Sequence, residues 1–112
     1  MEIIEEIIGE VVVEIINSDR ATINESQALK NALQLKLDAG YNKFIVDLSA
    51  CEFVDSTFLG VLVSNLKKAA KLNGDLRLVG FKPVVRSMFE LTRMFRVFAS
   101  YSDLQEAIKS FR

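Results

Sequence analysis

The sequence predicts an α/β fold, with a mixed sheet opened by an N-terminal hairpin and followed by alternating helices and strands. The chain begins with two segments rich in Ile and Val, residues 2–8 and 10–16, which are separated by Gly9 and are typical of two strands joined by a tight turn. Beyond them, apolar residues at helical spacing alternate with short apolar runs, as in parallel strands joined by helices. At 112 residues, without an internal repeat or a linker, residues 1–112 are expected to form one domain of about five strands and four helices.

The first half of the chain contains two strands, a helix and a third strand in this prediction. In residues 10–16 the side chains alternate between two faces, which carry Val11, Val13 and Ile15 on one side and Val12, Glu14 and Ile16 on the other. Asn24 and Gln27 resemble a capping box that opens a helix ending near Gly40. Within residues 43–48, Phe44, Ile45 and Val46 follow one another without alternation, as is typical of a strand covered on both faces.

The second half continues the alternation. Residues 56–72 give the most regular helical pattern, and Leu76–Val79 is a short strand. Pro83 fits the first turn of a third helix, and Arg96–Ala99 is expected to be a last, edge strand. Ser102 and Gln105 then resemble a second capping box, which opens the final helix.

Composition narrows the classes of function. The chain has no histidine, which excludes phosphohistidine transfer, histidine general-base catalysis and histidine-ligated zinc. Its formal net charge of -1 gives no general attraction to nucleic acid. Cys51 is the only cysteine, so no intramolecular disulfide forms, and we expect it to be inert. An acidic start and no apolar run near the ~18 residues of a membrane helix favour a cytoplasmic protein that neither enters a membrane nor binds nucleic acid directly.

The candidate site lies where the strand of residues 43–48 gives way to the helix of residues 56–72. Functional groups of open α/β sheets gather at this carboxyl edge. Asp55, Ser56 and Thr57 are all good N-cap types, and capping alone explains their presence. Alternatively, one hydroxyl accepts a phosphoryl group, whose charge of about -1.5 to -2 the positive helix N-terminus can hold locally.

Three short stretches surround this step: Asp47-Leu48-Ser49, Phe53-Val54-Asp55-Ser56-Thr57 and Leu59-Gly60-Val61-Leu62. Together they resemble the signature of the STAS family, the sulfate-transporter and anti-sigma-factor-antagonist domains, and the resemblance extends over nearly the whole chain. It implies a free-standing bacterial anti-sigma factor antagonist that is not an enzyme. Such a protein binds an anti-sigma factor when unphosphorylated, and thereby releases a sigma factor.

The resemblance also implies roles for individual residues. Thr57 corresponds to the phosphorylated position, with Ser56 as the alternative acceptor. The supporting or partner-binding residues would be Asp55, Ser56, Phe58, Asp47 and Ser49. The partners implied are an anti-sigma factor that is itself a serine/threonine kinase and a phosphatase that acts on the phosphorylated form. We expect a monomer or weak dimer, and neither a cofactor nor a metal.

Two departures from the family pattern and two other functions stay open. The acceptor is threonine where serine is commoner, and Phe58 stands where glycine is common, so Phe58 either contacts a partner or covers the core. The chain could instead be a non-switching STAS scaffold or a docking subunit of a signalling assembly or transporter. An enzyme or phospho-aspartate receiver fits poorly, and a magnesium site at Asp47, Glu52 and Asp55 would need more converging oxygens.

Overall fold

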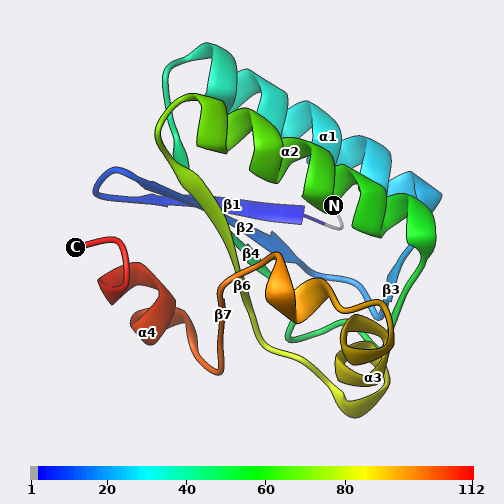
Figure 1. Ribbon diagram of the computed structural model, residues 1–112. Coiled ribbons are helices and arrows are strands. Elements are labelled where there is room, and N and C mark those ends of the chain that lie inside the picture. The colour runs from blue at the N-terminus through cyan, green and yellow to red at the C-terminus, as the bar shows by residue number, and fades with distance from the viewer. Residues whose placement is uncertain (1–2) are drawn as a thin grey trace.

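A five-stranded sheet organises the chain, as the computed structural model shows (Figure 1). The strands lie in the order β1-β2-β4-β6-β7, with the bounds Ile3–Ile8, Val11–Ile16, Lys43–Asp47, Asp75–Val79 and Ser100–Tyr101 respectively. β1 and β2 are antiparallel, and every later pair is parallel. The predicted mixed sheet with an opening hairpin is therefore confirmed. The structure describes residues 3–112, so residue 2 of the predicted first strand lies outside the described residues.

Four α-helices accompany this sheet in the described residues. Their bounds are Ile23–Asp38 for α1, Ser56–Lys71 for α2, Pro83–Leu91 for α3 and Leu104–Lys109 for α4. α1 and α2 lie side by side on one face of the sheet, and α4 lies on the other (Figure 1). The predicted helix 56–72 and the predicted proline at the first turn of the third helix are confirmed.

The core lies in two parts, one on each face of the sheet. Val12 and Ile16 of β2 pack beneath α1, α2 and α3, whereas Val11 and Val13 pack beneath α4. This confirms the alternation predicted for residues 10–16. Glu14 lies on the same face of β2 as Val12 and Ile16. It is fully buried, although a glutamate side chain is ordinarily charged.

Two capping predictions were one or two residues away from the observed caps. The first helix is capped by Thr22 instead of Asn24, and the Thr22 N–H donates to Glu25 Oε1 at 2.9 Å. The last helix is capped by Asp103 instead of Ser102, and Asp103 accepts from the Glu106 N–H at 2.9 Å. At α4 the Asp103 carboxylate replaces a neutral hydroxyl as the cap, and at α1 the Glu25 carboxylate replaces the neutral Gln27 as the capping-box partner. Negative charge is stabilised at both places, because they lie at helix starts.

The predicted last, edge strand is present as β7, but its predicted bounds, Arg96–Ala99, were wrong. The chain forms a 3-10 turn at Met94–Arg96, and the strand that pairs with β6 is Ser100–Tyr101. The Ala99 carbonyl oxygen, just before it, accepts from the Leu78 N–H at 3.0 Å. Arg93 has a φ of 60°, which ends the preceding helix. Phe95 then packs edge-on against Phe81, with ring centroids 5.1 Å apart. This aromatic contact holds the segment against the core as a turn and not as an extended strand.

A second, smaller sheet was not predicted from the sequence. It joins β3 (Arg20–Ala21) to β5 (Phe53–Val54) in parallel. These two-residue strands immediately precede the starts of α1 and α2. The small sheet therefore fixes the positions at which the two helices begin.

Candidate functional site

Asp55 forms the start of α2. Its backbone is extended, with φ -94° and ψ 174°, and its Oδ1 accepts a hydrogen bond from the Phe58 N–H at 2.8 Å. Its own N–H donates to the Ala21 carbonyl oxygen at 3.0 Å. The predicted N-cap role of Asp55 is confirmed, and the contact with Ala21 ties this cap to the small sheet.

The two candidate acceptors point away from the core. Ser56 and Thr57 are exposed, whereas Phe58 and Leu59, the next two residues of the same helical turn, are buried. Within the described residues, neither hydroxyl takes part in a side-chain hydrogen bond. A group added to either oxygen would therefore lie on the outer surface and leave the packing beneath α2 in place.

The structure decides between the two alternatives for Phe58. Its side chain is completely buried and belongs to the core cluster beneath α1, α2 and α3. Because no part of it reaches the surface, Phe58 covers the core and does not offer an exposed partner contact. It anchors the inner side of the turn that carries the two hydroxyls.

Asp47 and Ser49 form a separate polar turn at the end of β4. Asp47 Oδ1 accepts from both the Ser49 N–H at 2.9 Å and the Ser49 hydroxyl at 2.5 Å. Gly80, at φ +75°, lies against this turn, and a Cβ atom there would stand 2.1 Å from Ser49 Oγ. Among the described residues, no hydrogen bond joins this turn to Ser56 or Thr57, so it shapes the loop without touching the acceptors.

An apolar hollow of about 450 Å³ lies beside the site and was not foreseen from the sequence. It is lined by β5 and α3, and its most exposed apolar side chains are Leu91 at 85% and Val84 at 62%. The apolar residues of α3 are divided between two environments, because Val85 and Phe89 are buried while Val84 faces out.

The structure gives no support for a reactive cysteine or for a metal site among the described residues. Cys51 is fully buried, and this burial, followed by the nearby negative charge of Asp47, raises the pKa of its thiol to about 11. Asp47 and Asp55 direct carboxylate oxygens to backbone N–H groups, and Glu52 lies 4.0 Å from the Lys82 ammonium. Within residues 3–112, no group of three potential metal ligands converges.

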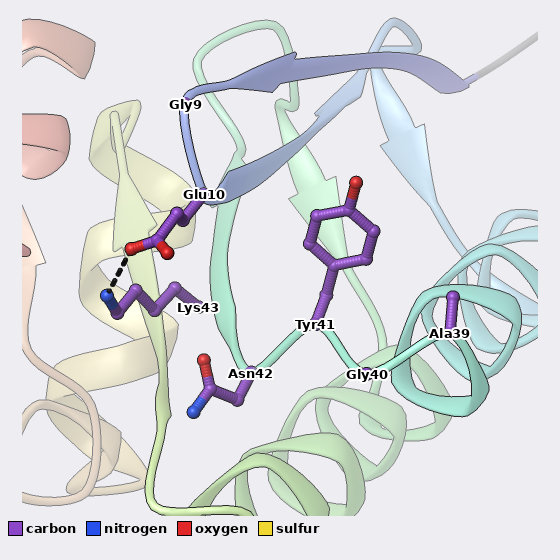
Figure 2. A pocket seen from close by; sticks show the side chains of 7 residues that line it. All are labelled: Gly9, Glu10, Ala39, Gly40, Tyr41, Asn42 and Lys43. Carbon is purple, nitrogen blue, oxygen red and sulfur yellow. Dashed lines mark hydrogen bonds and ion pairs between the residues drawn. The ribbon is translucent and has the colours of Figure 1, made fainter.

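A further hollow, of about 550 Å³, lies at the opposite end of the sheet (Figure 2). It is bordered by the turn at Gly9 and Glu10 and by the segment that leads into β4. Its charged groups are already paired, since Lys43 Nζ lies 3.1 Å from Glu10 Oε2. Lys43 begins β4 and Asp47 ends it, so this hollow is remote from the carboxyl edge of the strands.

Comparison with known proteins identifies the family to which this fold belongs. The family model described as the STAS domain matches residues 3–107. The chain belongs to the STAS domain family. Proteins that match by sequence include one of Thermotoga maritima, named as a candidate anti-sigma factor antagonist, which is 36% identical over 76 residues. That match covers 68% of this chain and 67% of the relative.

The sequence matches cover only part of these relatives. The homologous Thermotoga neapolitana protein, also named as a candidate antagonist, is 34% identical over 73 residues. The alignment covers 65% of this chain and 65% of that protein, slightly less than two thirds of its length.

Solved structures extend the likeness to nearly the whole STAS domain. The crystal structure of an anti-sigma factor antagonist from Mycobacterium paratuberculosis matches with a TM-score of 0.84 at 26% identity, covering 96% of this chain and 91% of that one. The Bacillus cell fate determinant SpoIIAA in its phosphorylated form matches with a TM-score of 0.77 at 17% identity, covering 98% and 99%. At that identity the second likeness concerns the fold alone. No helix within residues 3–112 has the length and apolar character needed to span a bilayer.

Proposed function

We propose that this chain is an anti-sigma factor antagonist whose activity is switched by phosphorylation of Thr57, and that residues 1–112 act as one domain. The observation that carries the proposal is the arrangement at the start of α2. There, two exposed hydroxyls stand on a helical turn whose inner side is anchored by Phe58. STAS membership and the antagonists among the matched proteins support this function.

The geometry explains how a phosphoryl group would act without unfolding the domain. It would add about -1.5 to -2 charges at neutral pH. The N-terminus of α2 stabilises negative charge, although the neighbouring Asp55 carboxylate opposes it. Because Thr57 is exposed and Phe58 stays in the core, the change is confined to the surface that a partner contacts.

The partner in this proposal is an anti-sigma factor that is also a serine/threonine kinase. It binds the unphosphorylated chain, releases its sigma factor, and in time phosphorylates Thr57, with Ser56 as the alternative acceptor. A phosphatase restores binding. The apolar hollow between β5 and α3 supports this interaction, since Phe53 and Val54 border it and lie immediately before Asp55. It supplies the partner with apolar contact area next to the switch.

The proposal also concerns the compartment, the oligomeric state and the binding partners of the protein. We propose a cytoplasmic, non-enzymatic regulator that acts as a monomer or weak dimer and that contacts neither nucleic acid nor a membrane. It needs no cofactor, because its output is the presence or absence of one protein complex.

The first experiment combines the protein with ATP and the kinase-type anti-sigma factor of the same organism, followed by mass spectrometry of tryptic peptides. We expect one phosphate on Thr57, which Thr57→Ala abolishes and Ser56→Ala does not. If neither hydroxyl acquires phosphate while the complex forms normally, the switch is refuted and the non-switching scaffold function is favoured.

A second experiment measures binding of that anti-sigma factor to Thr57→Glu by calorimetry. We expect the added charge to weaken binding while thermal unfolding stays within about 0.5 kcal/mol of the parent, as for other exposed substitutions. Ser102→Glu adds the same charge at an exposed position that precedes α4 and should bind as the parent does. If Thr57→Glu also binds as tightly as the parent, the electrostatic explanation of the switch is wrong.

A further inference from the structure

Two adjoining hollows follow the outward side of α2, beginning at Thr57. The first, of about 250 Å³, is bordered by Thr57, Gly60 and Ser64, and by Lys30 from α1. The second, of about 550 Å³, continues along the helix to Lys71 and shares Gly60, Ser64 and Lys68 with the first. We call this continuous depression the α2 lane; it is lined by Thr57, Gly60, Ser64, Lys30, Lys67, Lys68 and Lys71, among others.

Gly60 gives the lane its depth, and nothing inside the chain requires a glycine there. A Cβ atom at this position would meet no other atom within 4 Å. Its backbone is helical and lies outside the left-handed region that favours glycine. A glycine in a helix interior also weakens the helix relative to alanine. The absence of a side chain at Gly60 therefore leaves the outer surface of α2 open, and it is not needed for packing inside the domain.

The walls of the α2 lane carry charge of one sign. Four lysines border it and no carboxylate does, although the whole chain has a net charge of -1. Among the described residues, none of the four forms an ion pair, whereas Lys36 and Lys43 each lie close to a glutamate. Lys68 Nζ donates only to the neutral Gln34 side chain, at 2.9 Å.

The helix dipole accounts for only part of this charge. Lys68 and Lys71 lie in the last turn of α2, where cations are stabilised. Lys30 lies in the middle of α1, away from either end of that helix, so the dipole gives no reason for its place beside the lane.

A buried polar atom lies under the same surface. Asn65 borders the first hollow with only 3% of its surface exposed. Its Nδ2 donates to the Val61 carbonyl oxygen, but its Oδ1 has no hydrogen-bond donor among the described residues. Buried polar atoms are usually paired, so this oxygen would be satisfied by a donor that enters the hollow, such as the ammonium group of a rearranged lysine.

We propose that the α2 lane binds an acidic segment of a partner protein, and that a phosphoryl group on Thr57 occupies the first hollow and competes with that segment for Lys30 and Lys68. The four lysines without an ion pair and the open surface at Gly60 support binding of the acidic segment. The second half rests on the proposed switch. In that step Thr57 Oγ1 forms the new bond to the γ-phosphorus of ATP, the bond to the ADP oxygen breaks, and the hydroxyl proton passes to a base of the kinase.

The binding half is tested on the unphosphorylated protein with a synthetic helical peptide of alternating glutamate and alanine turns. A second peptide with glutamine in place of every glutamate is the control. Titration of ¹⁵N-labelled protein should shift the amide signals of Gly60, Ser64 and Lys67 with the glutamate peptide only. The affinity should fall as salt is raised, since exposed charges are screened. No saturable shift, or equal shifts around Lys109 on the opposite face, would overturn the proposal.

Matched variants separate charge from shape. Lys68→Gln should weaken peptide binding about two- to five-fold, the range for one exposed ion pair, whereas Lys109→Gln should leave it unchanged. Gly60→Ala should weaken binding about ten-fold by filling the floor, although it raises the melting temperature. Asn31→Ala, which also favours the helix, lies on the exposed surface of α1 and should raise the melting temperature without weakening binding. If Gly60→Ala binds as tightly as Asn31→Ala, the lane does not take the segment.

A final comparison tests the specificity of the lane and the competition. Binding of a single-stranded oligonucleotide or of vesicles with anionic lipid at the same affinity as the peptide would show a general polyanion site and overturn the choice of occupant. With Thr57 phosphorylated, peptide affinity should drop by at least about ten-fold, and Lys30→Gln should reduce that drop. Peptide binding by the unphosphorylated protein needs no kinase. Failure of Thr57 phosphorylation and failure of peptide binding can therefore be distinguished. Unchanged peptide affinity after stoichiometric phosphorylation refutes only the competition between the phosphoryl group and the acidic segment.

Discussion

The buried carboxyl of Glu14 makes the stability of this domain depend on pH, and Glu14→Gln should remove that dependence. Glu14 lies on β2 directly opposite Glu5 of β1, and Lys36 of α1 lies 2.9 Å from Glu5. When Glu14 is ionised, both its oxygens lack a hydrogen-bond donor among the described residues. When it is protonated, it can donate to the Glu5 carboxylate that faces it. Burial is the larger cause and the contact with Glu5 the second, and together they raise the pKa of Glu14 to about 9.

The sign of the effect follows from this raised pKa. The unfolded chain has the ordinary Glu14 pKa of 4.5 and releases the proton above that pH, while the folded protein keeps the proton up to about pH 9. The stabilising contribution of Glu14 is therefore complete below about pH 4.5 and declines as the pH rises toward 9. Each pH unit in this window costs about 1.4 kcal/mol, so about 4 kcal/mol is lost between pH 5 and pH 8. The pKa of Glu5 is lowered, mainly by the bond from Glu14, so Glu5 stays ionised throughout.

Urea unfolding followed by circular dichroism at pH 5, 6, 7 and 8 measures this slope. Glutamine has nearly the same shape as protonated glutamate and can donate to Glu5, so Glu14→Gln should fold and should lose most of the decline. Glu6→Gln, an exposed change on the neighbouring strand, should decline as the parent does. If the parent and Glu14→Gln have the same slope, Glu14 is ionised in the folded protein and the reasoning is wrong.

Three other substitutions test the site and its surroundings. Asp55→Ala should lower the free energy of unfolding by about 1 kcal/mol through loss of the N-cap; an unchanged urea midpoint would contradict that role. Phe58→Ala should cost about 3–5 kcal/mol, because it leaves a cavity in the core; a loss below about 1 kcal/mol in the same assay would mean that the ring is not packed. Leu91→Ser should leave stability within about 0.5 kcal/mol, since Leu91 is 85% exposed, but should weaken binding of the anti-sigma factor in calorimetry; unchanged affinity would exclude the apolar hollow from the interface.

The parts of the fold that depend on local pattern could be predicted from the sequence. The hairpin, the parallel strands and the long helix from Ser56 follow from periods of two and of 3.6 residues in the apolar positions. The start of α2 was also predictable, because Asp55 is a strong N-cap type that stands immediately before a clear helical pattern. The STAS resemblance of this step was confirmed by the family match.

The parts that depend on tertiary contacts could not be read from local pattern. The edge strand expected at Arg96–Ala99 has the right composition, but Phe95 finds an aromatic partner in Phe81 and draws the segment into a turn. Phe58 could be assigned to the core only when the burial of its turn was known. The α2 lane required the side-by-side packing of α1 and α2, because Lys30 lies 27 residues before Thr57 in the sequence.

The small sheet of β3 and β5 has a consequence for when the site exists during folding. The Asp55 N–H bonds to Ala21, and the residues between them include all of α1 and β4. Closing such a distant contact costs more chain entropy than closing a local one, so it is formed late unless the intervening elements already hold its ends together. A copy in which this contact has not formed lacks the hydrogen bond that ties the Asp55 cap to the small sheet. Under the proposed switch, a kinase would therefore meet the hydroxyl turn in this tied geometry only on the folded domain.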